Sequence, residues 1–461
     1  MSSLWTSDEI AAATGGTPSA RFEVTGVTFD SREVGPGDLF VAMPGSVRDG
    51  HEFLDEAFAA GASGAIVSRP ASGPHVLVDN VPAALEALGR ASRERSRATI
   101  IGVTGSVGKT STKEALFAAL DRNRPGRVHR SVKSYNNHTG VPLSLARMPR
   151  EAEFGVFEMG MNHSGEIRAL TRQVRPDVAI ITAIAPAHIE NLGSEEAIAD
   201  AKSEILEGLG REGVAILPND TVHRDRLVKA ARRHAERIIT FGTGDADVHA
   251  IHAVSAETGG SLISAALLER ELTFTISQRG EHWVSNALAV LAAVEAVGED
   301  VAVAALALSD LGGLKGRGER HRLEIDGGEL LLIDESYNAN PASMAATLKS
   351  LGAEREAKRR IAVLGPMREL GEHSAELHAD LATAVRDAGV DRLILIGDEM
   401  RPLAEKVVGT ISFDLVGDVE EAIQSLMQMV RPGDAVLVKA SNSVGLARLV
   451  DQMVKGMPCS T

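Results

Sequence analysis

The chain has 461 residues, too many for one ordinary hydrophobic core, and at about 150 residues per domain its length predicts roughly three domains. Hydrophobic residues make up 44% and charged residues 24%, which is the profile of a folded, water-soluble protein. The net charge of −15, with no dense Lys/Arg block, argues against a nucleic-acid partner, because binding to a phosphate backbone needs a basic face.

The chain ends and the cysteine content point to a cellular compartment. The N-terminus has no basic start followed by an apolar stretch, so we expect no secretory signal. The most apolar helical stretch, residues 287–297, is interrupted by Glu295 and is shorter than the roughly 20 residues that span a bilayer. The single cysteine, Cys459, excludes a disulfide within the chain. We therefore expect a cytoplasmic protein that does not insert into a membrane.

The first region, residues 1–96, mixes short strand-like runs with short helical patterns. The strand-like runs cover residues 38–42, 65–67 and 76–78. The region ends in the polar stretch 90–97, which is typical of a linker or of the end of a surface helix. This pattern predicts a small α/β domain.

The second region, residues 97–316, alternates continuous apolar runs with helical patterns. The runs cover residues 99–103, 154–158, 178–184, 214–217 and 237–241. Such runs predict a parallel sheet covered by helices on both faces. A more β-like insert at 248–276 and a strong helix at about 284–297 follow.

The third region, residues 317–461, follows a stretch typical of a hinge, because residues 312–318 contain four glycines. Its strand-like runs, each followed by a helical pattern, cover residues 330–334, 361–364, 393–396 and 435–438. This alternation predicts a second, smaller doubly wound unit. The expected fold class is therefore α/β, with three domains.

The segment Gly105-Ser-Val-Gly-Lys-Thr110 lies between a predicted strand and a predicted helix. Glycines there let backbone N–H groups converge on phosphate oxygens, and the helix N-terminus adds partial positive charge. Lys109 is expected to reach the β- and γ-phosphates and Thr110 to bind magnesium. The strict eight-residue pattern has a glycine where this chain has Val103. The segment still predicts nucleotide binding, although no guanine-reading Asn-Lys-x-Asp accompanies it.

Glu158, His188 and the stretch 334–341 have residue types that suit a nucleotide site, but each has a structural alternative. Glu158 and His188 both follow buried strands, so they could hold magnesium, or could form an ion pair and a structural contact respectively. Lys202, judged by composition and spacing, is a solvated helix lysine. The stretch 334–341 could read adenine and ribose, but its Asp and Asn residues also favour turns for local reasons.

Together these segments resemble the Mur ligases, the ATP-dependent amide-bond-forming enzymes of bacterial cell-wall precursor synthesis. The resemblance covers nearly the whole chain and is closest to the branch that adds D-alanyl-D-alanine. It is carried by Thr104-Gly-Ser-Val-Gly-Lys-Thr110, Glu158-Met-Gly-Met-Asn-His-Ser-Gly-Glu-Ile167, Ser336-Tyr-Asn-Ala-Asn-Pro341 and Gly365-Pro-Met-Arg-Glu-Leu-Gly371. The Asp-Asn-Pro-Arg of the diaminopimelate-adding branch is absent.

The resemblance implies three domains. Residues 1–96 would be a UDP-sugar-binding domain, 97–316 a central P-loop ATP-binding domain with a doubly wound parallel sheet, and 317–461 a Rossmann-like ligase domain. The implied substrates are ATP, a UDP-N-acetylmuramoyl-tripeptide and D-alanyl-D-alanine. The implied reaction joins the last two through an acyl phosphate. The sequence itself does not indicate an oligomeric state, and we expect a monomer by default.

The resemblance also implies roles for individual residues. The catalytic residues would be Lys109, His188, Lys202 and Arg317. The ATP contacts would be Thr104, Gly105, Ser106, Val107, Gly108, Lys109, Thr110, Ser111, Asn286, Arg317, Asp334, Tyr337 and Asn338. The UDP-substrate contacts would be Ser31, Arg32, Asp49, Gly50, His51, Asn136 and Asn137, with His138 in the same stretch. Asn338 and Asn340 would bind the dipeptide.

Two magnesium ions are implied, with Thr110, Glu158, His188 and Lys202 as ligands. Lys202 aligns with a lysine that related ligases carry as a carbamate (N6-carboxylysine), which would turn this cation into a carboxylate-like ligand. The family usually has an asparagine after the histidine at 282, where this chain has Trp283, so one adenine contact is lost or replaced by stacking. Thr139 stands where isoleucine is usual.

Two alternatives to this function remain open from the sequence. A folylpolyglutamate-synthase-like ligase shares the central and C-terminal architecture, but the segment 30–42 argues against it because that enzyme lacks a uridine-binding front domain. A nucleotide-binding switch or scaffold that hydrolyses ATP slowly is the second alternative. These two alternatives and the Mur ligase function can be distinguished by the acceptor substrates that stimulate ADP release.

Overall fold

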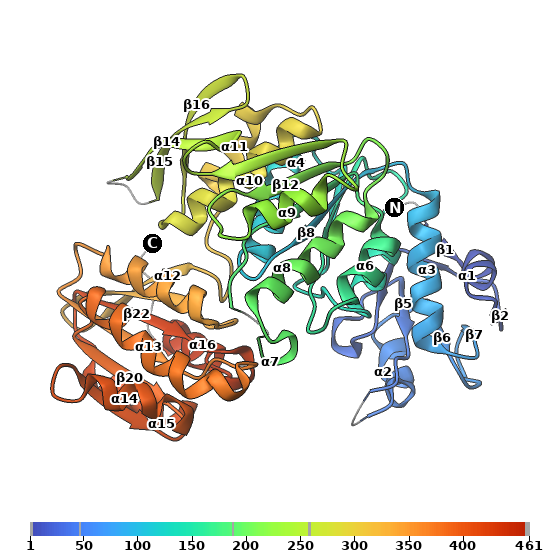
Figure 1. Cartoon of the computed structure of the whole chain (residues 1–461). Coiled ribbons are helices and arrows are strands. Elements are labelled where there is room, and N and C mark those ends of the chain that lie inside the picture. Colours follow the sequence, from blue (N-terminus) through green and yellow to red (C-terminus); the bar gives the residue numbers. More distant parts are fainter. Residues whose placement is uncertain (1–2, 46–47, 187–188, 257–259, 457–461) are drawn as a thin grey trace.

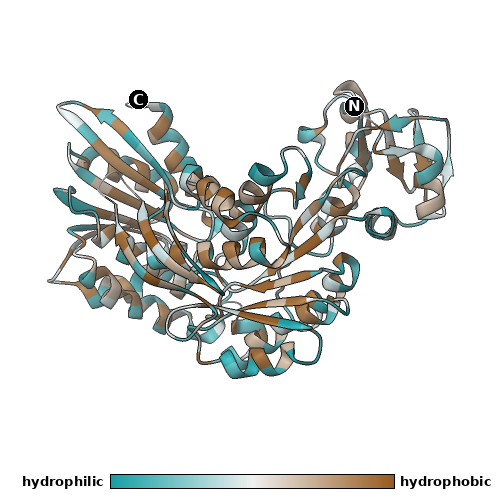
Figure 2. Cartoon of the chain, turned by 90° about the horizontal axis from the view of Figure 1, so that it is seen from above, coloured by the Kyte–Doolittle hydropathy of each residue, from teal (hydrophilic) through white to brown (hydrophobic). Residues whose placement is uncertain are grey.

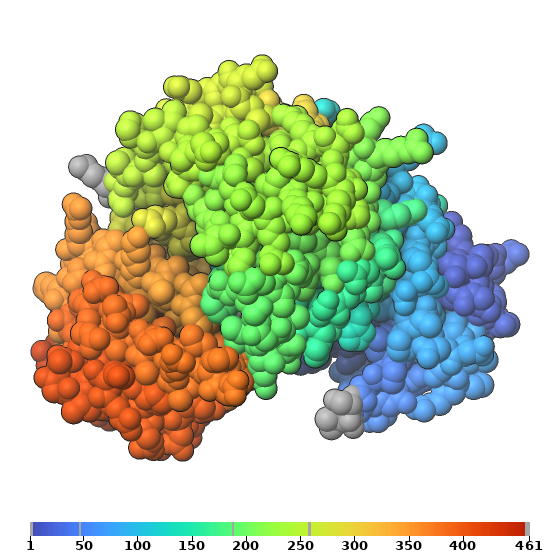
Figure 3. Space-filling view, in the orientation of Figure 1, coloured from blue at the N-terminus to red at the C-terminus, as the bar shows by residue number. Residues whose placement is uncertain are grey.

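The computed structural model describes residues 3–45, 48–186, 189–256 and 260–456. Its three larger sheets lie in three successive parts of the chain. The N-terminal unit and the C-terminal unit lie on opposite sides of the central unit (Figures 1 and 3). The hydropathy colouring shows many hydrophobic residues along the strands, whereas the helices carry both hydrophilic and hydrophobic residues (Figure 2).

The N-terminal unit is a five-stranded sheet in the order β2-β7-β6-β5-β4, in which β2 is the one antiparallel strand. A two-stranded antiparallel pair, β1 with β3, lies beside it. The strands are β1 (Trp5–Thr6), β2 (Thr17–Pro18), β3 (Glu23–Val24), β4 (Gly26–Thr28), β5 (Asp38–Val41), β6 (Gly64–Val67) and β7 (His75–Leu77). The helices are α1 (Ser7–Thr14), α2 (Leu54–Ala59) and α3 (Val81–Arg95).

The central unit is a nine-stranded sheet in the order β16-β15-β14-β13-β12-β11-β8-β10-β9. From β9 to β14 all pairs are parallel, and β15 and β16 extend the sheet as an antiparallel hairpin. The strands are β8 (Thr99–Thr104), β9 (Val128–Arg130), β10 (Phe154–Glu158), β11 (Val178–Ile181), β12 (Val214–Pro218), β13 (Arg237–Gly242), β14 (Val248–Ser255), β15 (Ser261–Leu267) and β16 (Arg270–Ile276).

Helices cover both faces of this central sheet. The helices are α4 (Lys109–Asn123), α5 (Gly140–Ala146), α6 (Glu166–Val174), α7 (Ile189–Leu192), α8 (Glu195–Ser203), α9 (Arg224–Ala231), α10 (Glu281–Ala296) and α11 (Val301–Asp310). Ile101 and Val103 of β8 pack with α4, α10 and α11, whereas Ile100 packs with α5, α6 and α8. Side chains of β8 thus contribute to hydrophobic cores on both faces of the sheet, and β8 is buried at its centre.

The C-terminal unit is a six-stranded sheet in the order β17-β18-β22-β19-β20-β21, parallel except for β17. The strands are β17 (Glu319–Ile325), β18 (Gly328–Glu335), β19 (Arg359–Leu364), β20 (Arg392–Ile396), β21 (Ser412–Val416) and β22 (Asp434–Lys439). The helices are α12 (Pro341–Gly352), α13 (Ser374–Asp387), α14 (Arg401–Val407), α15 (Val419–Met429) and α16 (Ala447–Gly456). The first three cover one face of this sheet and the last two cover the other.

The predicted α/β class and the predicted parallel strands are confirmed, with small differences at their ends. The strand expected at 178–184 ends at Ile181, and the helix expected at about 284–297 begins at Glu281. Strands β9, β17 and β21 were not predicted, because their polar or half-buried residues do not form continuous apolar runs. The domain boundaries at 96/97 and 316/317 remain predictions. Across the described ranges, no helix is long and apolar enough to cross a bilayer.

Candidate active site

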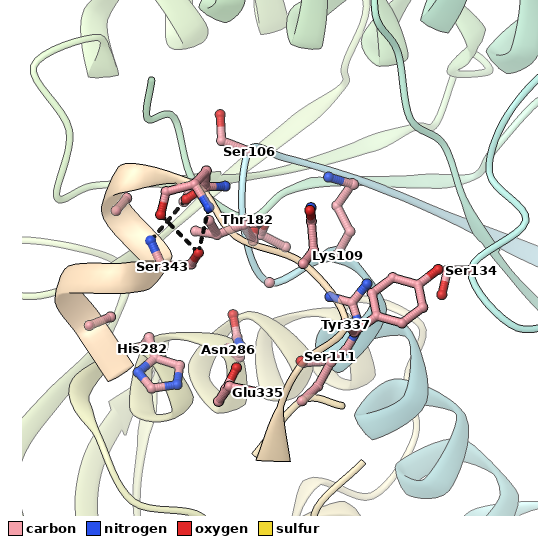
Figure 4. A pocket seen from close by; sticks show the side chains of 18 of the residues that line it. Ser106, Lys109, Ser111, Ser134, Thr182, His282, Asn286, Glu335, Tyr337 and Ser343 are labelled. Carbon is pink, nitrogen blue, oxygen red and sulfur yellow. Dashed lines mark hydrogen bonds between the residues drawn. The ribbon is translucent and has the colours of Figure 1, made fainter. Parts of the chain in front are cut away.

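A cavity of about 400 Å³ lies between the central and C-terminal units. From the central unit it is lined by residues of the phosphate loop, of the ends of β10 and β11, and of the start of α10. From the C-terminal unit it is lined by the loop before β17, the segment after β18 and the end of β22. Figure 4 shows the side chains that project into it. The predicted site residues that line it are Ser106, Val107, Gly108, Lys109, Ser111, Asn136, Glu158, Asn286, Arg317, Tyr337, Asn338 and Asn340.

The phosphate loop has the backbone geometry that its glycines permit. Gly105 has φ +150° and Gly108 has φ +84°, and Gly108 immediately precedes α4. Ser106 fixes the loop to the end of β11, because its N–H donates to the Ala183 carbonyl at 2.8 Å and its hydroxyl donates to the Ala185 carbonyl at 2.8 Å. The N-terminus of α4 therefore faces the cavity at a fixed position, which suits an anionic ligand.

A side chain at Gly108 is expected to damage this loop. A Cβ atom there would lie 2.6 Å from Oδ1 of Asn286, a cavity residue of α10. The left-handed backbone conformation at Gly108 would add strain to this close contact. Gly126 has φ +72° with nothing within 4 Å of its Cβ position, so it is a matched control. We expect Gly108→Ala and Gly126→Ala each to lose about 1–2 kcal/mol of unfolding free energy from backbone strain. Only Gly108→Ala should also weaken binding of an ATP analogue, measured by calorimetry; equal affinities in the two variants would contradict this.

Lys109 is half-buried beside the phosphate loop that it follows. Its Nζ donates to the Gly105 carbonyl at 2.7 Å. Burial lowers the pKa of Lys109, and the negative charge of Glu158 opposes that shift. A phosphate group in the cavity would supply the counter-charge that a buried ammonium needs.

Glu158, at the end of β10, brings the predicted magnesium ligands together. Its side chain is buried, and it accepts hydrogen bonds from Thr110 Oγ1 at 2.8 Å and Asn136 Nδ2 at 2.7 Å. A hydroxyl and a carboxylate this close, beside the phosphate loop, are the oxygen donors that Mg²⁺ prefers and shares with nucleotide phosphates. The residues present therefore fit a magnesium ion.

The other two predicted metal ligands differ in what the structure describes. His188 lies outside the described residues. Lys202, in the last turn of α8, is only 1% exposed. Burial, with a smaller contribution from the positive charge of Lys109, lowers the pKa of Lys202 well below its usual value. The prediction from composition that Lys202 is a solvated lysine is therefore wrong. Its side chain lies close enough to Lys109 for the two charges to interact.

The hinge stretch places Arg317 at the cavity. The Arg317 guanidinium lies 4.2 Å from the centroid of the Tyr337 ring, so two predicted nucleotide contacts stack on each other. Asp334, by contrast, does not line the cavity and is 1% exposed. Its Oδ2 accepts from the Gly316 N–H at 2.8 Å and its Oδ1 from the Ser336 N–H at 3.0 Å. In this arrangement Asp334 holds the loop that carries Arg317.

Asn340 and Asn338 both border the cavity but have different local roles. Asn340 Oδ1 accepts from the Ser343 N–H at 2.9 Å and caps the N-terminus of α12. Asn338 is exposed, and its backbone carbonyl accepts a hydrogen bond from Lys439 Nζ at 2.9 Å. The Asn338 side chain is thus the freer of the two to meet a ligand.

The start of α10 forms the end of the cavity away from Lys109 (Figure 4). Burial, with a contribution from the positive charge of Lys439, lowers the pKa of His282 to about 4, so its ring is neutral near pH 7. Trp283 also lines the cavity, but it is 6% exposed and packs in the central core. The neutral imidazole of His282 and the amide of Asn286 could form hydrogen bonds with a nucleobase, and Trp283 contributes an aromatic surface to the cavity lining.

Sequence reasoning missed Glu335 and Lys439, which also line the cavity. They are register partners at the ends of the neighbouring strands β18 and β22, with Lys439 Nζ 3.4 Å from Glu335 Oε2. Burial raises the pKa of Glu335 and lowers the pKa of Lys439. A charged residue at the end of a buried strand is the signal that could have identified both, as it did for Glu158.

The predicted UDP-substrate residues of the N-terminal unit lie outside the cavity. Arg32 is paired with Asp30 through two hydrogen bonds of 2.8 and 2.6 Å. His51 is held between Asp49, whose Oδ1 lies 2.7 Å from Nδ1, and the Ser68 N–H, which donates to Nε2 at 2.9 Å. Gly50 begins the short 3₁₀ turn capped by Asp49, and Ser31 begins another after Asp30.

The loop between β9 and α5 connects these residues with the cavity. Tyr135 packs against Phe29 of the N-terminal unit, with ring centroids 5.4 Å apart, and Lys133 forms an ion pair with Glu33. Asn136, which follows Tyr135, contacts Glu158. The side chain of Asn137 accepts a hydrogen bond from the Gly140 N–H at 3.0 Å, at the start of α5. His138 is exposed. The loop therefore runs from the N-terminal unit to the predicted magnesium ligands.

Comparison with known proteins gives consistent results along the chain. Three family profiles match: Mur ligase family, catalytic domain, over residues 23–98; Mur ligase middle domain, over 103–294; and Mur ligase, glutamate ligase domain, over 316–442. The UDP-N-acetylmuramoyl-tripeptide–D-alanyl-D-alanine ligase of Synechocystis is 35% identical over 96% of this chain and 94% of its own length.

Two solved structures are similar over nearly their whole length. MurF from Acinetobacter baumannii superposes with a TM-score of 0.84 at 29% identity, covering 98% of this chain and 99% of that one. MurF ligase from Thermotoga maritima, solved in complex with ADP, gives a TM-score of 0.76 at 29% identity, covering 94% and 97%.

Proposed function

The chain belongs to the Mur ligase family. We propose that the residues around its interdomain cavity bind the substrates and catalyse the reaction of an ATP-dependent amide ligase. The enzyme adds D-alanyl-D-alanine to UDP-N-acetylmuramoyl-tripeptide and so makes a peptidoglycan precursor. The observation that carries the assignment of residues is the single cavity in which Lys109, Glu158 and Arg317 meet. These three side chains come from different elements of two units, as expected for a site that joins separately bound substrates.

The first step activates an inert acid. A carboxylate resists attack by an amine, so a carboxylate oxygen of the tripeptide attacks the γ-phosphorus of ATP. The bond from that phosphorus to the β,γ-bridging oxygen breaks, giving an acyl phosphate and ADP. Catalysis of such a transfer is mainly positioning and charge neutralisation. Lys109 at the phosphate loop and Arg317 across the cavity supply positive charge from opposite sides.

The second step forms the amide. The free amine of the dipeptide attacks the acyl carbon, a proton leaves the nitrogen, and the tetrahedral intermediate expels phosphate. The acyl phosphate is sensitive to hydrolysis, so this step needs a site that excludes bulk water. A cavity between two units provides such exclusion. We assign Asn338 and Asn340 to the dipeptide, because both border the cavity on the C-terminal side.

Thr110 and Glu158 would hold one magnesium ion, and His188 with a carbamylated Lys202 would hold a second. Bound there, magnesium would neutralise negative charge on the phosphate oxygens. Thr110 and Glu158 already contact each other, so their oxygens need little rearrangement. Asn136 orients the Glu158 carboxylate through its second oxygen.

The remaining assignments follow the same division. Thr104, Gly105, Ser106, Val107, Gly108 and Ser111 form the phosphate cradle, Asn286 and Tyr337 contact the nucleoside, and Asp334 acts through the Arg317 loop. Ser31, Arg32, Asp49, Gly50, His51, Asn136 and Asn137 take the UDP-substrate. We propose domains at 1–96, 97–316 and 317–461, in a monomeric cytoplasmic enzyme.

ADP release tests the proposed reaction. We expect fast release with ATP, a UDP-N-acetylmuramoyl-tripeptide and D-alanyl-D-alanine together, and at least about 100-fold slower release when either acceptor is omitted. The assay should include tripeptides ending in diaminopimelate and in lysine, to identify the preferred one. ADP release indifferent to both acceptors would indicate an ATP-driven switch, and stimulation by a folate with glutamate would indicate a folylpolyglutamate-synthase-like enzyme.

A further inference from the structure

Glu319, His321 and Asp334 form a mixed carboxylate–imidazole cluster on the hairpin of β17 and β18. One ligand atom from each lies within 4.8 Å of the others, and this is the one such group of three among the residues that the structure describes. Glu319 and Asp334 are direct register partners, and His321 follows Glu319 by two residues. Because alternate residues of a strand share a face, the antiparallel pairing brings all three side chains to the same side of the hairpin.

The imidazole has an atom that the fold leaves without a hydrogen bond. His321 Nε2 is buried and has no hydrogen-bond partner, although the ring as a whole is 17% exposed. The nearest carboxylate oxygen, Glu319 Oε2, lies 3.6 Å away, beyond hydrogen-bonding range. A buried nitrogen without a partner costs free energy, so a ligand for it would stabilise the cluster. Two ligand atoms of a tetrahedral zinc ion lie about 3.3 Å apart. The distance of 3.6 Å between His321 Nε2 and Glu319 Oε2 is close to this value.

Asp334 is already oriented for such a ligand. It is 1% exposed, and each of its carboxylate oxygens accepts one backbone N–H, from Gly316 at 2.8 Å and from Ser336 at 3.0 Å. Each oxygen keeps a second lone pair. Hydrogen bonds that fix a carboxylate in this way are typical of the groups that support metal ligands.

The lysine nearest in sequence to the cluster is already paired with a carboxylate outside it. Lys315 lies nearby, but its Nζ is 2.8 Å from Asp451 Oδ1. The hydrogen bond from Asp451 raises the pKa of Lys315, and the negative charges of Asp334 and Glu319 add to that shift. The Lys315 ammonium is therefore held by Asp451 and does not take the place of a cation among Glu319, His321 and Asp334.

We propose that Glu319, His321 and Asp334 bind a divalent first-row transition-metal ion, separate from the magnesium of the nucleotide cavity. The imidazole donor favours zinc-like ions over Mg²⁺ and Ca²⁺, which prefer all-oxygen sites. The ion would share Asp334 with the hinge, because Gly316 N–H and Gly318 N–H donate to the side chain and carbonyl of Asp334, each at 2.8 Å. Metal binding would therefore stiffen the loop that carries Arg317.

Zinc titration of the untagged full-length protein tests this site. With Mg²⁺ and ADP in excess to occupy the nucleotide cavity, we expect calorimetry to show one more Zn²⁺ bound by the wild type than by His321→Ala. Glu319→Gln should weaken that binding by more than about tenfold. His252→Ala, at an exposed histidine of β14, is the matched control and should bind as the wild type does.

Two further readouts make the result decisive. Zn²⁺ should slow amide hydrogen exchange at Gly316 and Gly318 in the wild type and in His252→Ala but not in His321→Ala. In chelator-treated buffer all of these variants should keep wild-type melting temperature and ADP release, because none of the substituted residues touches the reacting groups. Equal Zn²⁺ stoichiometry and affinity in the wild type, His321→Ala and Glu319→Gln would overturn the proposal, whatever the ligase activity.

Discussion

Replacing Lys109 by methionine is expected to lower kcat about 10³-fold while leaving the melting temperature unchanged or higher. The ammonium neutralises charge on the transferred phosphoryl group, and methionine keeps the length of the side chain without its charge. In the protein without nucleotide, Lys109 is half-buried, and its Nζ donates a hydrogen bond to the Gly105 carbonyl at 2.7 Å. A buried cation held for a ligand destabilises the empty site, so removing it should not weaken the fold.

Lys113, one turn further along α4, provides the matched control. Lys113 is fully buried, and its Nζ lies 2.7 Å from Glu114 Oε1 and 3.3 Å from the Ser131 carbonyl and contacts the Lys133 carbonyl. Lys113→Met leaves these acceptors without a donor, so we expect it to lose about 1–3 kcal/mol of unfolding free energy. Steady-state kinetics and thermal unfolding of both variants check the contrast. A destabilised but active Lys109→Met would show that Lys109 is a structural residue.

The phosphate loop illustrates what a sequence can predict. Its motif, its place between a strand and a helix, and the carboxylate at the end of the next buried strand are all local signals. Together they located Lys109, Thr110 and Glu158, and the structure brings all three side chains to one place. The parallel strands were predictable for the same reason, since a strand buried on both faces is a continuous apolar run.

Other features depend on partners that are distant in sequence. The contact that forbids a side chain at Gly108 comes from Asn286, and the Arg317 loop is fixed by Asp334, which the sequence had suggested as a nucleotide contact. Each of Glu335 and Lys439 ends a buried strand, but their contact with each other became visible only when β18 and β22 were paired. The polar strand β17 was missed altogether, and with it the cluster formed by Glu319 and His321.

Lys202 is the residue whose interpretation changes most between sequence and structure. On a helix with acidic neighbours it resembles a surface lysine, but its side chain is 1% exposed. Burial, together with the charge of Lys109, lowers its pKa well below the usual value and so increases the share of neutral amine. A neutral amine can attack CO₂, forming a C–N bond and releasing a proton, and the product is a carbamate with a negative charge. That charge would offset the buried cation of Lys109 and would supply an oxygen ligand for magnesium.

Lys202→Ala is therefore expected to lower kcat by at least about 10²-fold, and formate or acetate should restore part of the activity by occupying the vacated space. Lys229→Ala, at an exposed lysine in the last turn of the neighbouring helix α9, is the control and should retain full activity. In ¹³C-bicarbonate the wild type should show a carbamate carbon resonance that Lys202→Ala and Lys202→Arg lack. Because carbamate forms from the neutral amine, this resonance and the activity should decline together as the pH falls. Full activity of Lys202→Ala without added carboxylate would exclude the carbamate, and loss of activity without rescue or resonance would leave Lys202 as a buried positive charge beside Lys109.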